Sequence, residues 1–193
     1  MMIKILIFLL NLIMTLASHG WIYFGGEITL EENERAVYID QNGQAILLLP
    51  GEDSVSSRFH HVIYSDETRT YLMTSTPVDG ERVFSSKPLE FSFGEQKELL
   101  IEATLKYHYD LDRILDLHKK WVMFHNEKSL SGNLIGVITR HTTISILSDI
   151  QDEEYLYQYW DEIENEILGE IEIALIEEGI IVDSFRIDSV TEK

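Results

Sequence analysis

The sequence predicts an α+β fold with an N-terminal transmembrane helix over residues 1–26 and one domain over residues 27–193. In that domain, mainly antiparallel strands are predicted to precede several helices and a closing strand. Three observations lead to this prediction: an uncharged stretch at the start of the chain, a strictly alternating strand near its middle, and a long amphipathic helix followed by a strand at its end. A chain of 193 residues can form one such domain with a substantial core.

The uncharged stretch runs from Ile5 to Gly26, between the charged residues Lys4 and Glu27. As a helix, its 22 residues would be about 33 Å long, which is enough to cross a hydrocarbon core of about 30 Å. Aromatic residues near its end occupy the place of an interfacial belt. We predict that the residues at this membrane interface are Trp21, Tyr23 and Phe24.

A cleaved signal peptide is the alternative interpretation of the same stretch. Its apolar region would be Ile5–Ala17, and Thr15-Leu16-Ala17 has the small residues of a cleavage site. In both interpretations, Lys4 and the α-amino group stay on the cytoplasmic side, and only acidic residues follow the apolar stretch. The domain is therefore predicted to be extracytoplasmic, which means periplasmic in a bacterium, on a single-pass or a released chain.

The composition excludes several classes of protein. With 34 acidic and 15 basic residues, the formal net charge is −19, which argues against binding to nucleic acids or, by charge, to anionic lipids. The absence of Cys excludes disulfides, thiolate nucleophiles and Cys-ligated metals. The charge is also uneven, because residues 106–140 carry a net charge of +2 and residues 149–193 carry −13.

The first half of the domain is predicted to be β-structure. Turn signals such as Asn42-Gly43 and Val78-Asp79-Gly80 separate its short apolar runs. In the last run, apolar and polar residues alternate with a period of two, which indicates one buried face. The predicted strands are Ala36–Ile39, Ala45–Leu49, Phe59–Tyr64, Thr70–Thr76, Leu89–Phe93 and Leu99–Tyr109.

The period then changes to that of a helix. Asp110 is predicted to cap a first helix, whose apolar residues are Ile114, Leu115, Leu117, Trp121 and Val122. A second helix is predicted over residues 130–147. The residues predicted to face inward from it are Leu134, Val137, Ile138 and Ile144.

The third helix has the strongest periodicity. Ser148-Asp149-Ile150-Gln151 resembles a capping box, and Glu178-Gly179 is a stop signal before a closing strand over Ile180–Val190. Its apolar residues recur at helical spacing: Leu156, Tyr159, Trp160, Ile163, Ile167, Ile171 and Leu175. The aromatic residues at its start, Tyr155, Tyr157, Tyr159 and Trp160, are interpreted as core and interface residues rather than as a ligand platform.

Three phrases of the sequence resemble the SPFH/Band 7 family, which includes stomatins, prohibitins and flotillins. Residues 98–118, ELLIEATLKYHYDLDRILDLH, resemble its strand-then-helix signature. Residues 161–190 resemble its acidic helix, glycine and closing strand, and residues 44–51, QAILLLPG, resemble its early strand and Pro-Gly turn. Where the family often has Thr-x-Asp-Gly, this chain has Phe91-Ser92-Phe93-Gly94-Glu95, and it ends at Lys193, where the family usually continues into a coiled coil.

The resemblance implies an SPFH-like domain in a membrane-anchored scaffold that is not an enzyme. Members of the family assemble side by side into rings or cages and modulate membrane proteases or channels. The resemblance therefore implies three kinds of partner. They are membrane lipid through the N-terminal helix, further copies of the chain or a longer family member, and a membrane protease or channel. The alternative that does not rest on the resemblance is a secreted or periplasmic α+β binding protein released by signal-peptide cleavage.

No site for catalysis, metals or cofactors is predicted. His60-His61 point to opposite faces of a strand, and His118 and His125 would lie about 10 Å apart along a helix, too far to share a metal without Asp116 or Glu127. The sequence has no Gly-x-Ser-x-Gly elbow, HExxH motif or phosphate-binding loop. Paired carboxylates abound in residues 149–178, but their number makes any single pair uninformative about acid–base catalysis.

The uneven charge suggests an assembly contact. No Lys or Arg lies between Arg140 and Arg186, so Glu pairs four residues apart in the third helix repel by a few tenths of a kcal/mol each. This acidic face is either simply solvated, or it contacts the basic segment of the next copy in a head-to-tail ring that weakens with salt. The residues predicted for such a contact are Lys106, Arg113, Lys119, Lys120 and Lys128 on one copy and Glu162, Glu166 and Glu170 on the next.

Overall fold

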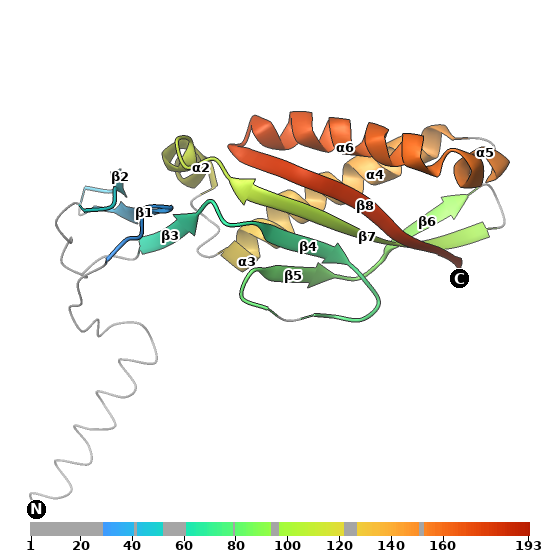
Figure 1. Cartoon of the computed structure of the whole chain (residues 1–193), viewed down its shortest axis with the longest axis horizontal. Helices are drawn as coiled ribbons and strands as arrows, with labels where there is room; N and C mark the ends of the chain where they lie inside the picture. Colours follow the sequence, from blue (N-terminus) through green and yellow to red (C-terminus); the bar gives the residue numbers. More distant parts are fainter. Residues whose placement is uncertain are drawn as a thin grey trace, which may run out of the picture.

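The chain folds into two β-sheets with helices packed on the larger one, so the predicted α+β class is confirmed (Figure 1). The computed structural model describes residues 29–40, 42–51, 61–78, 80–93, 97–121, 127–150 and 153–193. The predicted helix over residues 1–26, with Trp21, Tyr23 and Phe24, lies outside these residues. Among the helices that are described, none has both the length and the apolar composition needed to cross a membrane.

The smaller sheet has three antiparallel strands in the order β2-β1-β3. They are β1 (Glu34–Ile39), β2 (Ala45–Leu48) and β3 (His61–Ser65). The predicted turn between β1 and β2 forms as expected. The Asp40 carboxylate accepts backbone hydrogen bonds from Asn42 and Gln44, which lowers the pKa of Asp40. Residues 59–60 of the third predicted strand lie outside the described residues.

The larger sheet has five strands in the order β5-β4-β7-β6, with β8 along the other side of β7. Its strands are β4 (Arg69–Met73), β5 (Val83–Ser86), β6 (Leu89–Phe93), β7 (Lys97–Tyr109) and β8 (Ile180–Glu192). The alternation predicted for β7 is confirmed, since every second residue from Leu99 to Tyr109 is buried. β5 was not predicted, and it pairs with β4 in parallel, whereas the other strand pairs are antiparallel.

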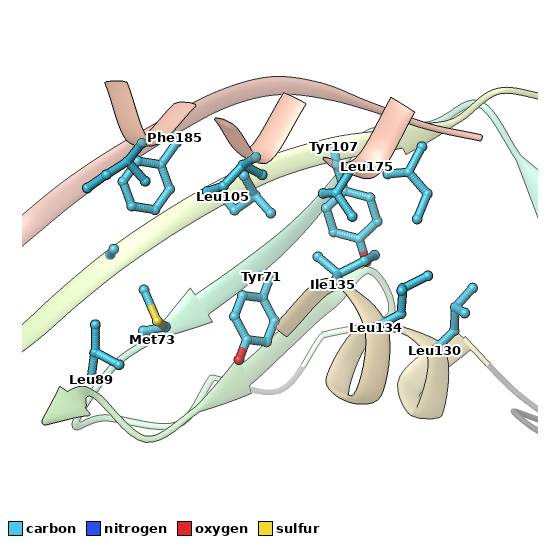
Figure 2. Packing of buried hydrophobic residues seen from close by; sticks show 14 of the residues in the cluster. Tyr71, Met73, Leu89, Leu105, Tyr107, Leu130, Leu134, Ile135, Leu175 and Phe185 are labelled. Atoms are coloured by element: carbon cyan, nitrogen blue, oxygen red, sulfur yellow. The ribbon is translucent and has the colours of Figure 1, made fainter. Parts of the chain in front are cut away.

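Helices cover one face of the larger sheet. The described helices are α2 (Ile114–Trp121), α3 (Glu127–Leu130), the π-helix η1 (Ser131–Ile135), α4 (Gly136–Asp149), α5 (Glu153–Gln158) and α6 (Trp160–Ile176). α2, by contrast, lies beside the smaller sheet (Figure 1). The buried residues of β7 face the helix layer, and Figure 2 shows the ring of Tyr107 pointing toward Ile135 of η1. The Tyr107 hydroxyl donates a hydrogen bond to Ser131 Oγ at 3.2 Å.

The second helix forms, but two residues predicted to face inward do not. Val137 is 57% exposed and Ile144 is 39% exposed, whereas Leu134 is buried and Ile138 packs against the core. The face of α4 that is buried carries mainly small residues instead. These residues are Gly136, Thr139, Thr143 and Leu147.

The close approach of α4 to the sheet explains this difference. A Cβ atom added at Gly136 would lie 2.6 Å from the Tyr71 hydroxyl, so only glycine fits there. The hydroxyls of Thr139 and Thr143 donate to the carbonyls four residues before them, each at 2.7 Å. Because each hydroxyl has a partner within the helix, these threonines can be buried without an unsatisfied polar group.

The third predicted helix is divided in two, and its predicted capping box is wrong. Ser148 lies in the last turn of α4, where its hydroxyl donates to the Ile144 carbonyl at 2.7 Å, so it does not cap the next helix. Tyr159 is not a core residue, because it lies between α5 and α6 with a non-helical backbone and stacks on the exposed Tyr155. Of the other residues predicted in the core of this helix, Trp160 is partly buried against the core, and the rest are buried: Leu156, Ile163, Ile167, Ile171 and Leu175.

The predicted stop signal and closing strand are confirmed. Gly179 has φ of 77°, the left-handed conformation that allows α6 to end and β8 to begin. The Gly179 carbonyl accepts a hydrogen bond from the Asp110 backbone N–H at 3.0 Å, and Asp110 caps the turn before α2 by accepting from the Asp112 N–H at 3.1 Å. The end of α6 is thereby fixed next to the start of α2.

Candidate assembly interface

The three predicted acidic residues lie on the exposed side of α6. Glu162, Glu166 and Glu170 are all exposed, and among the described residues no ion pair involves them. Carboxylates four residues apart repel one another on this face; Glu162 lies in the first turn of α6, where the helix dipole favours a negative charge, whereas Glu166 and Glu170 lie further along the helix. The acidic face of this helix is therefore exposed, and its role in a contact between copies stays a prediction.

Two of the five predicted basic residues act inside the chain. The Arg113 guanidinium donates hydrogen bonds to the carbonyls of Ile176, and of Glu177 at 2.7 Å, at the C-terminal end of α6. Carbonyls at the end of a helix lack the usual intrahelical donors, although the Ile176 carbonyl also accepts from the Gly179 backbone N–H at 3.1 Å; a cation there also interacts favourably with the helix dipole. Arg113 therefore stabilises the end of α6 in its own subunit.

Lys120 has a similar intrachain role. Its Nζ atom donates to Glu178 Oε1 at 2.5 Å, and Trp121 Nε1 donates to Glu178 Oε2 at 2.8 Å. Burial alone would raise the pKa of Glu178, but these two hydrogen bonds and the charges of Lys120 and Arg113 outweigh it and lower that pKa. Glu178 thus joins α2 to the end of α6, which leaves three of the predicted cations for contacts with other molecules.

Those three cations are all exposed, and they lie on different elements. Lys106 is on β7, Lys119 on α2 and Lys128 on α3. No ion pair or hydrogen bond from their ammonium groups is found in the described ranges of the chain. Each is therefore available to meet a carboxylate on another molecule.

The outer stripe of α6 consists of Glu162, Glu166, Gly169, Ile173 and Ile176. Their spacing of four, three, four and three residues places them on one side of the helix, opposite its buried residues. The stripe is acidic in its first half and apolar in its second half, where Ile173 is 60% exposed and Ile176 is 56% exposed. Its apolar half was not predicted, although the spacing of these residues from Glu162 and Glu166 is visible in the sequence.

The free edge of β8, by contrast, is poorly suited to pairing with another strand. Two register shifts leave Asp183 and Asp188 as extra residues opposite β7. The Asp183 carboxylate is hydrogen-bonded to His108 Nδ1 at 2.9 Å, and the Asp188 carboxylate accepts from Thr104 Oγ1 at 2.5 Å. Bulges of this kind bend an edge strand and hinder edge-to-edge association.

A side chain of α6 also occupies the edge of β8. The backbone N–H of Ile187 donates to Glu164 Oε1 at 2.6 Å, so one edge donor already has a partner. The open face of the sheet is likewise hydrogen-bonded within the chain. Glu102 there accepts from the backbone N–H and the hydroxyl of Ser75, both at 2.6 Å, and these bonds lower the pKa of Glu102.

The histidines considered as metal ligands are placed apart or not described. The His118 side chain is buried, and its Nδ1 is hydrogen-bonded to the Tyr64 hydroxyl at 2.9 Å. His60 and His125 lie outside the described residues. In the ranges that the structure describes, no three His, Asp or Glu side chains come together as a metal site.

The bond between His118 and Tyr64 belongs to a buried aromatic cluster that joins the two sheets. Tyr64 of β3 packs edge-on against Tyr109 of β7, with ring centroids 5.4 Å apart. The guanidinium of Arg69, which is itself buried, lies 4.4 Å from the centroid of Tyr109. This cluster fixes the smaller sheet and α2 against the larger sheet.

Comparison of the chain with family models gives no match, and comparison with curated proteins gives none either.

Proposed function

We propose that this protein is a membrane-anchored, SPFH-like scaffold without catalytic activity of its own. In this proposal, residues 1–26 anchor the chain in the membrane with Trp21, Tyr23 and Phe24 at the interface, and the domain is extracytoplasmic. Copies of the domain assemble side by side and organise or modulate a membrane protein such as a protease or a channel. The partners are membrane lipid, further copies of the chain or a longer SPFH-family protein, and that membrane protein.

The observation that carries the proposal is the exposed outer stripe of α6. It combines carboxylates that no described cation neutralises with two isoleucines that are more than half exposed. An exposed apolar and charged surface on a helix is typical of a contact between proteins. It is also located in residues 161–190, one of the three phrases that resemble the SPFH/Band 7 family.

The packing of two of the segments that resemble the SPFH/Band 7 family against each other supports the proposal further. Residues 98–118 contain most of β7 and the first part of α2, and residues 161–190 contain most of α6 and of β8. In the fold, β7 pairs with β8 over eleven residue positions, and the end of α6 binds Arg113 and Lys120 beside α2. The two segments therefore form one packed unit, as they would if both belong to one SPFH-like domain.

Co-purification of two differently tagged full-length copies from one detergent extract tests the proposal. A scaffold made of several copies retains the second tag when the first is captured, and the complex is recovered from the membrane fraction. Recovery of only one tag from each capture would contradict assembly.

The N-terminal residue of the mature chain separates the proposal from the secreted or periplasmic binding protein. An anchored scaffold retains Met1. A chain that begins near Ser18 and is released from the membrane would favour the binding protein instead.

A further inference from the structure

We infer that the outer stripe of α6 is the surface through which one copy of this chain contacts the next, and that Gly169 is the point of closest approach. This inference rests on the proposed scaffold function and names the contact within it. The second surface of the contact belongs to another copy of the same chain. At Gly169, an added Cβ atom would have open space within the described part of the subunit.

Gly169 lies near the middle of α6, where glycine is the least favourable residue other than proline. A glycine in a helix is often explained by a neighbouring element that leaves no room for a side chain. That explanation holds for Gly136, whose Cβ would collide with Tyr71, but it fails for Gly169, whose Cβ would meet no atom within 4 Å. The described part of the subunit thus leaves open space where a second molecule can approach the helix backbone.

The residues that follow Gly169 on the stripe supply the apolar part of this contact. Ile173 and Ile176 lie one and two turns beyond it on the same side of the helix and are among the most exposed large apolar residues of the described chain. Val137, also more than half exposed, lies at the start of α4, which packs beside α6 (Figure 1). Apolar side chains next to a notch in a helix favour a partner that packs closely, and not merely solvent.

Charge complementarity identifies the partner as a second copy. The acidic half of the stripe, Glu162 and Glu166, requires cations on the other side of the contact. The same chain presents Lys106, Lys119 and Lys128 on other elements, exposed and without a described acidic partner. Because the two surfaces differ, the contact is head-to-tail, and repeated contacts of this kind close into a ring when the rotation between copies allows it.

Other surfaces of the subunit are less suitable for this contact. The edge of β8 is bent by two bulges and has one N–H occupied by Glu164, and the open sheet face is hydrogen-bonded within the chain. The acidic side of the contact, on α6, leaves both of these surfaces intact, whereas Lys106 meets the next copy from the open face of β7. The helix layer therefore supplies one side of the contact between neighbouring copies.

The test compares the mass of the full-length, detergent-extracted particle for the native chain and three variants. Gly169→Leu fills the notch and is expected to abolish the assembled species. Ile173→Ser removes an exposed apolar contact and is expected to raise the dissociation constant by roughly tenfold or more. Thr76→Leu adds the same leucine to an exposed loop between β4 and β5 and is expected to leave the mass unchanged.

Subunit folding is checked by circular dichroism. A Cβ at Gly169 would meet no atom within 4 Å and Ile173 is 60% exposed, so neither change should unfold the domain. Native-size particles for both Gly169→Leu and Ile173→Ser would overturn the inference while leaving the scaffold function standing. A native chain that is already a single copy would overturn the scaffold function and the inference together. A smaller particle for Thr76→Leu as well would show that any added leucine disrupts assembly, and would also overturn the specific role of Gly169.

Discussion

The substitution Gly136→Ala tests how closely α4 packs on the larger sheet. An alanine Cβ at this position would lie 2.6 Å from the hydroxyl oxygen of Tyr71 and 2.8 Å from Cζ of its ring. Tyr71 is buried, and its hydroxyl donates to Ser86 Oγ at 2.8 Å. The ring therefore cannot move away without losing a hydrogen bond, and the helix cannot move away without opening the core.

The expected loss of stability follows from three contributions. Overpacking of this kind costs about 1–3 kcal/mol. Disturbing the hydroxyl bond costs about 1 kcal/mol more, while alanine gains about 1 kcal/mol over glycine in helix propensity, so these two contributions roughly cancel. Gly136→Ala is thus expected to destabilise the chain by about 1–3 kcal/mol, or to lower Tm by roughly 2–4 °C for each kcal/mol in a protein of this size.

Thermal unfolding followed by circular dichroism measures this effect, with Gly132→Ala as the matched control. Gly132 lies four residues earlier in the same run of helix, and a Cβ there would meet no atom within 4 Å. The control is expected to keep or raise Tm. The double variant Gly136→Ala with Tyr71→Phe, which removes the nearest oxygen, is expected to recover part of the loss. Equal Tm values for Gly136→Ala and Gly132→Ala would refute the close packing of α4.

Three further expectations concern other parts of the molecule. Burial lowers the pKa of His118, so the neutral side chain stabilises the fold above its ordinary pKa of 6.5. This contribution is lost as the pH falls from 6.5 toward the lowered pKa. His118→Gln should therefore flatten the dependence of Tm on pH in that window, and an unchanged slope would contradict this prediction. Glu178→Gln should lower the free energy of unfolding in chemical denaturation by about 1–3 kcal/mol, because it weakens the hydrogen bonds from Lys120 and Trp121. An unchanged free energy of unfolding would show that the contact between α2 and the end of α6 contributes little stability. Lys119→Glu should reduce the size of the assembled particle without lowering Tm, whereas Lys120→Glu should lower Tm; the reverse pattern would contradict the division between the two lysines.

Elements with a simple period could be predicted from the sequence. β7 alternates from Leu99 to Tyr109 because one face packs on helices and the other is open. Apolar residues therefore indicate the buried face, and the residues between them indicate the open face. The buried positions of α6 follow in the same way from their four-residue spacing. The left-handed glycine at 179 could be expected because a helix that turns sharply into a strand favours that conformation.

The inner face of α4 could not be predicted, because its packing reverses the usual relation between hydropathy and burial. Thr139 and Thr143 are buried since their hydroxyls bond to backbone carbonyls of the same helix, and Val137 is exposed. The preceding π-helix also changes the number of residues per turn, which alters the face that follows it. Neither effect is visible in a hydrophobic pattern.

The assembly contact could be predicted only in part. The charge pattern identified Glu162 and Glu166 as uncompensated, but it could not separate cations used within the subunit from those left outside it. Arg113 and Lys120 approach the end of α6 only because Gly179 turns the chain and Asp110 binds its carbonyl. Such a relation between distant segments depends on the fold and not on local spacing.

The mass of the native, full-length particle in detergent at low and at high salt tests the central claim most directly. We expect a discrete assembly of several copies at low salt that becomes smaller as salt screens the pairing of Glu162 and Glu166 with lysines of the next copy. A single copy at low salt would contradict the account.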